Sequence, residues 1–133
     1  MRYLLDTNVC VVYLNGRSNE VRDRLISTPI EDMAMCSVVK SELFYGAMRS
    51  NNPTKTLERQ QEFLERFVSL PFGDKSALLF GQIQARLASA GTPIGAHDLQ
   101  IAAIALANNL ILVTHNTREF ERVEGLQLED WEV

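Results

Sequence analysis

The sequence predicts a single α/β domain in which a mostly parallel sheet lies between two layers of helices. Short apolar segments alternate along the chain with longer segments that have helical periodicity. Strands that alternate with helices favour a parallel sheet covered on both faces, which is a three-layer α/β/α architecture. The 133 residues are 46% hydrophobic, which is enough for one sizeable core. No linker or internal repeat marks a second domain, so we expect one domain over residues 1–133.

The first half of the chain shows the alternation most clearly. We expect a strand, two helices, a second strand and a third helix, at residues 3–6, 9–14, 20–27, 33–36 and 38–49. Capping residues at positions 6–8 precede the first helix, and an Asn-Gly-Arg-Ser break at 15–18 ends it. The third helix is indicated by Val39, Leu43 and Ala47, which recur at helical spacing.

The second half continues the pattern. We expect a helix that begins near Pro53 and an edge strand at 68–72. Two helices at 75–90 and 94–107 should follow, then a strand at 110–114 and a short last strand at about 126–128. Pro71 would fit poorly in a central strand, so the segment around it belongs at an edge. Gly91-Thr92-Pro93 stops the helix before it. The helix at 94–107 is apolar almost all round, so it should be central.

Four polar residues, Asp6, Glu42, Asp98 and Asn116, stand at the edges of apolar segments and far apart in sequence. Asp6 and Asn116 follow expected strands, and Glu42 and Asp98 fall near the starts of helices. Because sites in parallel sheets form at the carboxyl ends of the strands, these four side chains can converge on one rim. Carboxylates gathered there would repel each other without a cation, so the pattern indicates a divalent metal held by oxygen ligands.

Each of these residues also has an ordinary structural interpretation. Asp6 suits the N-cap of the first helix, Glu42 a solvated helix face, and Asn116 a turn after a strand. Asp98 fits such a role least well, because it shares a helix face with apolar side chains. The two histidines beside the site residues, at positions 97 and 115, are expected to be exposed or hydrogen-bonded rather than metal ligands.

Composition narrows the class of protein. The formal net charge is −4, which argues against a general electrostatic binder of nucleic acid but does not exclude a nuclease whose acids hold cations. No apolar run is long enough for a membrane span, and the N-terminus does not resemble a secretory signal. Cys10 and Cys36 lack zinc-site spacing and suit buried, reduced thiols. We therefore expect a cytoplasmic protein with no membrane partner.

Four blocks of the sequence resemble the PIN-domain ribonucleases and, more narrowly, the VapC toxins of prokaryotic toxin–antitoxin pairs. The blocks are Leu5-Asp6-Thr7-Asn8-Val9, the segment 37–47 around Glu42, the segment 94–103 around Asp98, and the segment 112–120, Leu-Val-Thr-His-Asn-Thr-Arg-Glu-Phe. One such block would be weak, but four in this order and spacing are specific. The resemblance covers residues 3 to about 131.

The resemblance implies a PIN-like fold and an endoribonuclease that depends on Mg²⁺ or Mn²⁺, with Asp6, Glu42 and Asp98 as metal-binding acids and Asn116 as the fourth site residue. Many relatives carry an aspartate where this chain has Asn116, and Glu119 is the candidate for the missing acid. Asp6 and Asp98 are the expected direct ligands, whereas Glu42 either binds metal or orients the attacking water. Thr7 and Thr114 are expected to donate hydrogen bonds to a carboxylate or a phosphate.

The same resemblance implies partners. The substrate would be a structured RNA such as a tRNA, and a small antitoxin would cover the site with its tail. A homodimer is implied as well, with DNA contacted only through the antitoxin.

Two alternatives remain open. One is a catalytically silent PIN-like binding module, in which Asn116 marks a decayed site. The other is a receiver-type signalling domain, which Leu5-Asp6-Thr7 and Val113-Thr114-His115 fit poorly, since they lack adjacent acids and a lysine.

Overall fold

A five-stranded parallel sheet forms the centre of the computed structural model, which describes residues 1–133. Its strands are β1 (Tyr3–Leu5), β2 (Met33–Cys36), β3 (Val68–Leu70), β4 (Ile111–Val113) and β5 (Leu128–Glu129). Their order across the sheet is β3-β2-β1-β4-β5, and every neighbouring pair is parallel. The expected parallel sheet is confirmed, with Val68–Leu70 at an edge. Because all strands point the same way, their carboxyl ends share one rim.

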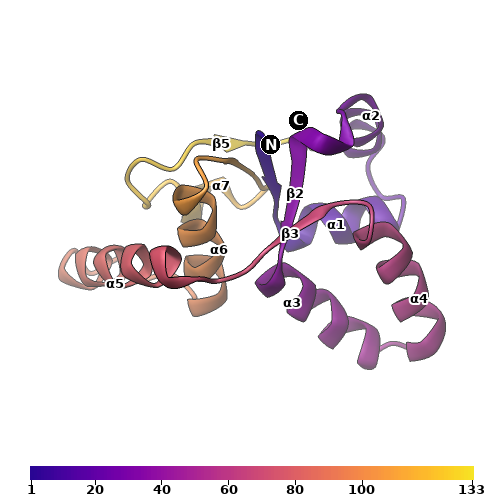
Figure 1. Cartoon of the computed structure of the whole chain (residues 1–133), viewed down its shortest axis with the longest axis horizontal. Helices are drawn as coiled ribbons and strands as arrows, with labels where there is room; N and C mark the ends of the chain where they lie inside the picture. Colours follow the sequence, from indigo (N-terminus) through magenta and orange to yellow (C-terminus); the bar gives the residue numbers. More distant parts are fainter.

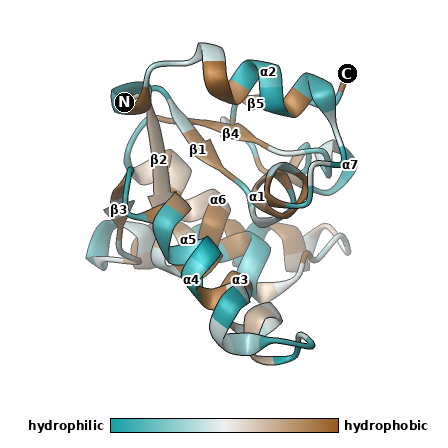
Figure 2. Cartoon of the chain, turned by 90° about the vertical axis from the view of Figure 1, so that its right-hand side faces the viewer, coloured by the Kyte–Doolittle hydropathy of each residue, from teal (hydrophilic) through white to brown (hydrophobic).

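Helices cover both faces of this sheet. They are α1 (Thr7–Leu14), α2 (Asn19–Ser27), α3 (Ser37–Met48), α4 (Pro53–Leu64), α5 (Asp74–Ser89), α6 (Ala96–Ala107) and α7 (Thr117–Phe120). Helices α5 and α6 lie on one side of the strands, and α1 and α4 lie on the other (Figure 1). In Figure 2, β1 and β4 are mostly hydrophobic, whereas α2, α3 and α4 carry hydrophilic turns. The expected three-layer architecture is therefore confirmed.

The burial of each element agrees with its place. All residues of β1 and β2 are buried, whereas β3 exposes Val68 and Ser69, as an edge strand can. Helix α6 buries every residue from Leu99 to Ala105 except Gln100, which confirms that it is central. The ring of Trp131 is almost fully buried and packs edge-on against Tyr3 at a centroid distance of 5.3 Å. This contact ties the C-terminal segment to the sheet.

Several boundaries differ from the sequence-based expectation. Helix α6 begins at Ala96, because Gly95 is its N-cap and Pro93 precedes it in extended chain, so Ile94 is outside the helix. The last strand is at 128–129 rather than 126–128, where it pairs with β4. A 3-10 turn at Ile30–Asp32 and the four-residue helix α7 were not predicted, because elements this short show no periodicity.

Two further expectations concern cysteine and the membrane. Cys10 and Cys36 are both buried and free, as expected, and Sγ of Cys10 lies 3.8 Å from Sδ of Met35. Burial raises the pKa of the Cys36 thiol to about 11. Both cysteines therefore behave as small apolar core residues. None of the helices combines the length and the apolar character that crossing a bilayer would require.

Candidate functional site

Asp6 follows β1 directly and is the N-cap residue of α1. Its Oδ1 accepts a hydrogen bond from the backbone N–H of Thr7 (2.8 Å), and its Oδ2 accepts one from Oγ1 of Thr114 (2.7 Å). Only 4% of the residue is exposed. Because an ionised carboxylate has about four acceptor positions, two bonds leave half of them unused. The N-cap interpretation is therefore correct, but it accounts for only part of this buried anion.

Glu42 lies in the second turn of α3, the helix that follows β2. Its Oε1 accepts a hydrogen bond from Oγ1 of Thr7 at 2.5 Å, and its Oε2 is 3.4 Å from Nδ1 of His97 on α6. The Glu42 side chain is 29% exposed and has these two contacts, so solvent surrounds only part of it. The hydroxyl of Thr7 thus joins Glu42 to the N-terminus of α1, next to Asp6.

Asp98 occupies the first turn of α6 and contacts Glu119 of α7. Burial raises the pKa of Asp98 to about 7, and the charges of Glu119, Asp6 and Glu42 act in the same direction. Ionisation of Asp98 is therefore disfavoured when no cation is present, and its hydrogen bond with Glu119 raises the pKa of Asp98 further.

Asn116 links Glu119 to the strand end. The backbone N–H of Asn116 donates to Oγ1 of Thr114 (3.0 Å), and its Nδ2 donates to Oε2 of Glu119 (2.7 Å). Oε1 of Glu119 accepts a bond from the backbone N–H of Gly95 (3.1 Å). Burial acts to raise the pKa of Glu119, but the bonds from Gly95, Asn116 and Asp98 outweigh it and leave this pKa below its ordinary value. Since Glu119 accepts only, the Oδ1 of Asn116 stays free to serve as a further ligand.

The four carboxylates of Asp6, Glu42, Asp98 and Glu119 are thus one connected group, which we call the acid cluster. Burial raises the pKa of Asp6 despite its two hydrogen bonds, and the charges of Glu42 and Glu119 add to this effect. Crowding of like charges costs free energy unless a cation offsets it. The available donors are carboxylate, amide and hydroxyl oxygens, which suit Mg²⁺ or Mn²⁺. The residues present therefore fit the divalent metal implied by the sequence.

An open cavity adjoins the cluster. Glu42 and Asp98 line it together with Gly95 to His97, and its volume is about 360 Å³. Small molecules and a nucleic-acid backbone can therefore reach the two carboxylates from solvent. His97 is exposed at its rim, as expected for a histidine that is not buried as a ligand.

A second group with metal-ligand chemistry lies nearby. Ligand atoms of His115, Asp130 and Glu132 all lie within 4.8 Å of one another, a spacing that the carboxylates of the acid cluster do not reach. Nδ1 of His115 is 2.9 Å from Oδ2 of Asp130 and 3.5 Å from Oε2 of Glu132. The hydrogen bond with Asp130, together with the charges of Glu132 and Asp130, raises the pKa of His115. Nδ1 of His115 already contacts both acids, so the close spacing of this group needs no metal.

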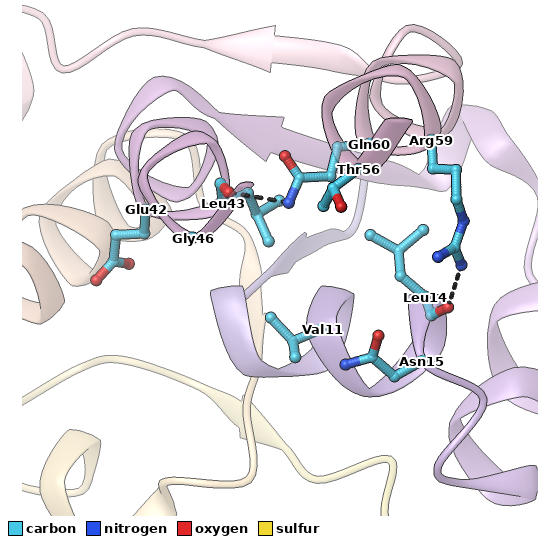
Figure 3. Close-up of a pocket in the computed structure, with 9 residues that line it drawn as sticks. All are labelled: Val11, Leu14, Asn15, Glu42, Leu43, Gly46, Thr56, Arg59 and Gln60. Atoms are coloured by element: carbon cyan, nitrogen blue, oxygen red, sulfur yellow. Dashed lines mark hydrogen bonds between the residues drawn. The ribbon is translucent and has the colours of Figure 1, made fainter. Parts of the chain in front are cut away.

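A groove lies between α1, α3 and α4 and has a volume of about 220 Å³ (Figure 3). Its polar side chains serve mainly to hold helices together: Arg59 donates to the backbone oxygen of Leu14 (2.6 Å), and Nε2 of Gln60 donates to that of Leu43 (2.9 Å). Glu42 stands at one end of the groove, and its carboxylate points away from Arg59 and Gln60. The groove therefore meets the acid cluster only at Glu42, since none of the other three acids lines it.

The structure brings together all of the residues that the sequence singled out. Asp6, Glu42, Asp98 and Asn116 lie at one rim, and the hydroxyls of Thr7 and Thr114 donate to carboxylates as expected. Glu119 turns back toward the site, because α7 places it one turn after Asn116. Sequence reasoning missed Asp130 and Glu132 as partners of His115; the only signal was the acidic end of the chain.

Comparisons with known proteins agree on one family. A model of the PIN domain matches residues 3–126. A protein from Shigella flexneri named "tRNA(fMet)-specific endonuclease VapC" is 40% identical over 131 residues, and its counterpart from Salmonella typhimurium is 37% identical; the matches cover 98% of both chains. Among solved structures, the DNA-bound VapBC complex from Salmonella typhimurium matches with a TM-score of 0.93 at 37% identity, over 98% of each chain. FitAcB from Neisseria gonorrhoeae matches with a TM-score of 0.85 at 28% identity, over 98% of this chain and 99% of the other.

Proposed function

Because the chain belongs to the PIN-domain family and to its VapC branch, we propose that it is a metal-dependent endoribonuclease and the toxin of a toxin–antitoxin pair. One observation supports the site most directly: four carboxylates from separate elements meet at the carboxyl rim of the sheet, and burial raises the pKa values of Asp6 and Asp98. Such a group favours binding of a divalent cation. Family membership also sets aside the receiver-type signalling alternative.

Asp6, Glu42 and Asp98 are the residues that we assign to metal binding. A divalent cation bound there would supply positive charge next to the scissile phosphate and lower the pKa of a coordinated water. Thr114 and Thr7 hold the carboxylates of Asp6 and Glu42 in place through their hydroxyls. These bonds keep the ligand oxygens oriented before substrate arrives, which reduces the reorganisation needed for reaction.

Asn116 and Glu119 have supporting roles in this assignment. The amide of Asn116 donates to Glu119, so its free Oδ1 can hold a water or a ligand without adding charge. Glu119 supplies the charge that an aspartate at position 116 would otherwise bring. The charge of Glu119 also raises the pKa of Asp98, so a divalent cation bound between these two acids would offset their repulsion.

We propose a structured RNA as the substrate, with tRNA as its class. The support is the naming of the Shigella and Salmonella relatives, which are 40% and 37% identical to this chain, as tRNA(fMet)-specific endonucleases. The test is to incubate the purified chain with total tRNA and Mg²⁺ and to sequence the new RNA ends. One dominant cut in one tRNA supports the proposal. Uniform degradation would leave a nuclease without the proposed specificity, and intact RNA with bound metal would favour the silent binding module.

An antitoxin partner follows from the same family. In the structure, Ile26 and Ile30 are 69% and 47% exposed beside a cavity of about 230 Å³ between α1, α2 and the end of α4. This apolar surface suits a segment of a partner protein, whose tail would then reach the acid cluster and block it. DNA contact would come through that partner. Adding the purified antitoxin should abolish RNA cleavage; unchanged cleavage in a stable complex would contradict the blocking role.

We also propose a homodimer, since Tyr45 and Met48 are large hydrophobic side chains that α3 leaves exposed. Light scattering of the purified chain should give about twice the mass of 15.0 kDa. A monomer at all concentrations tested would contradict this part of the proposal without affecting the site.

A further inference from the structure

A second cavity opens beside the acid cluster, between α1, the loop after β4 and the C-terminal segment. Its volume is about 460 Å³, and its walls include Asn8, Val11, Val12, Arg17 and Asn116. Through Asn116 it shares a residue with the candidate site. Asn8 directly follows Thr7, whose hydroxyl holds Glu42. The cavity is therefore an extension of the candidate site.

The way in which α1 ends fixes Arg17 at this cavity. Gly16 has a φ of 64°, in the left-handed region that favours glycine. The N–H of Gly16 donates to the backbone oxygen of Tyr13 (3.1 Å), and the N–H of Arg17 donates to that of Val12 (3.0 Å). These two bonds form the Schellman motif. The backbone of Arg17 is thus held next to Val12 before any ligand binds.

The guanidinium of Arg17 makes none of the side-chain hydrogen bonds or ion pairs found in the structure. By contrast, Arg22 pairs with Asp23, and Arg59, which shares a groove with Glu42, donates to a backbone oxygen. Arg17 is therefore a free cation in a cavity that contains a site residue, on a chain whose net charge is −4. A guanidinium without a partner suits a phosphate, which it can bind through two parallel N–H groups.

The rest of the cavity suits the other parts of a nucleotide. Val11 and Val12 are half-buried and offer an apolar surface to the face of a base. The side-chain amide of Asn8 is exposed and makes no hydrogen bond in the structure, so it can donate to and accept from a base edge. His115 and Glu132 also line the cavity and lie 3.5 Å apart (Nδ1 to Oε2), and the negative charge of Glu132 would repel a second phosphate.

We propose that this cavity binds the RNA nucleotide next to the scissile phosphate and that Arg17 contacts the phosphate of that nucleotide. The inference rests on the proposed ribonuclease function and adds a substrate subsite to it. Arg17 acts here as a positioning residue for RNA, because it lies outside the acid cluster.

The test measures binding of tRNA(fMet) to the Asp98→Asn protein by fluorescence anisotropy over a range of salt concentrations. Arg17→Ala, added to this background, should weaken binding about tenfold and reduce the slope of log affinity against log salt by about 1. Arg17→Lys should recover part of the affinity, since the charge remains. Arg22→Ala, which removes an exposed arginine already paired with Asp23, is the matched control and should leave both quantities unchanged.

RNA cleavage is measured in parallel for the wild-type chain and for the same arginine variants without the Asp98→Asn change. If the wild-type chain cleaves RNA but the Arg17→Ala and Arg22→Ala variants bind RNA equally well, the proposed subsite is wrong and the ribonuclease function stands. A loss of affinity without a change in the salt slope would also contradict a phosphate contact. If no variant binds RNA and none cleaves it, the proposed function is wrong as well.

Discussion

Two groups of titratable side chains lie within one rim of this molecule, and they solve the problem of crowded charge in different ways. The acid cluster holds four carboxylates in buried or half-buried positions, with hydrogen bonds from hydroxyls and amides but no arginine or lysine between them. The group of His115, Asp130 and Glu132 is more exposed and contains its own cation once the imidazole is protonated.

The difference shows why close spacing is a poor guide to a metal site. His115 and its two acids lie nearer to one another than the carboxylates of the cluster do, yet they satisfy each other. In the cluster, burial and the neighbouring charges raise the pKa values of Asp6 and Asp98, which costs stability. Only the two other acids have a basic group nearby: His97 lies 3.4 Å from Glu42, and the charge of Arg122 lowers the pKa of Glu119. Residues that lower the stability of a fold in this way are typical of functional sites. The following changes test this contrast, from the largest expected effect to the smallest.

Asp98→Asn should reduce RNA cleavage by at least about 100-fold while the fold remains intact. The change is nearly isosteric, and the introduced amide can still donate a hydrogen bond to Glu119, as the protonated acid does. Cleavage assays and circular dichroism of the purified variant measure the two effects. Wild-type cleavage by this variant would remove Asp98 from the site.

The rate at low Mg²⁺ should rise with pH by up to about tenfold per unit below pH 7 and level off above it. The reason is that the pKa of Asp98 is raised to about 7, and a cation must displace that proton. Without metal, the stability of the folded state should change with pH in the opposite direction to the rate. The raised pKa stabilises the folded state at low pH, and this contribution is lost as pH rises through 7. A flat rate profile between pH 5.5 and 7 would contradict the role of Asp98.

Asn116→Asp and Glu119→Gln should shift the Mg²⁺ dependence in opposite directions, each by several-fold up to about tenfold. An aspartate at 116 adds charge for the metal but faces Glu119 where the amide now donates at 2.7 Å, so metal-free stability should fall. Activity would then saturate at lower Mg²⁺. Removing the Glu119 charge should raise the Mg²⁺ needed. Titration curves that overlay the wild type for both variants would place both residues outside the metal site.

His115→Gln should change the melting temperature by no more than about 2 °C, with or without Mg²⁺, because exposed ion pairs contribute little. The thermal response to Mg²⁺ should equal that of the wild type. A response that disappears in this variant would mean that the divalent cation binds at His115, Asp130 and Glu132 instead of at the acid cluster.

Much of this arrangement is readable from the sequence, because buried strands and charged residues leave strong signals. The segments around Leu4 and Leu112 are apolar at every position, so both faces of these strands are apolar, which predicts central parallel strands. Asp6 and Asp98 stand out because carboxylates rarely follow or interrupt such runs without a reason. Short elements leave no such signal. Helix α7 has four residues, so the orientation of Glu119 toward Asp98 could not be inferred from periodicity.

Contacts between segments that are distant in sequence could not be predicted from the sequence either. Nothing at His115 indicates that Asp130 will lie 2.9 Å away, because that distance depends on how β5 pairs with β4 and on how Trp131 packs against Tyr3. The break at residues 15–18 was recognised as a helix end, but the position of Arg17 beside Asn116 follows only from the three-dimensional structure.

The most direct test of the metal site is the thermal melting of the purified wild-type chain at pH 7.5 in EDTA and in 10 mM Mg²⁺, with Asp98→Asn as the control. A cation that binds only the folded state raises stability by mass action, by about 2.7 kcal/mol at 100 times its dissociation constant. We therefore predict that Mg²⁺ raises the melting temperature of the wild type by several degrees and leaves that of the variant almost unchanged. Equal melting temperatures for the wild type with and without Mg²⁺ would contradict the assignment of the acid cluster as a metal site.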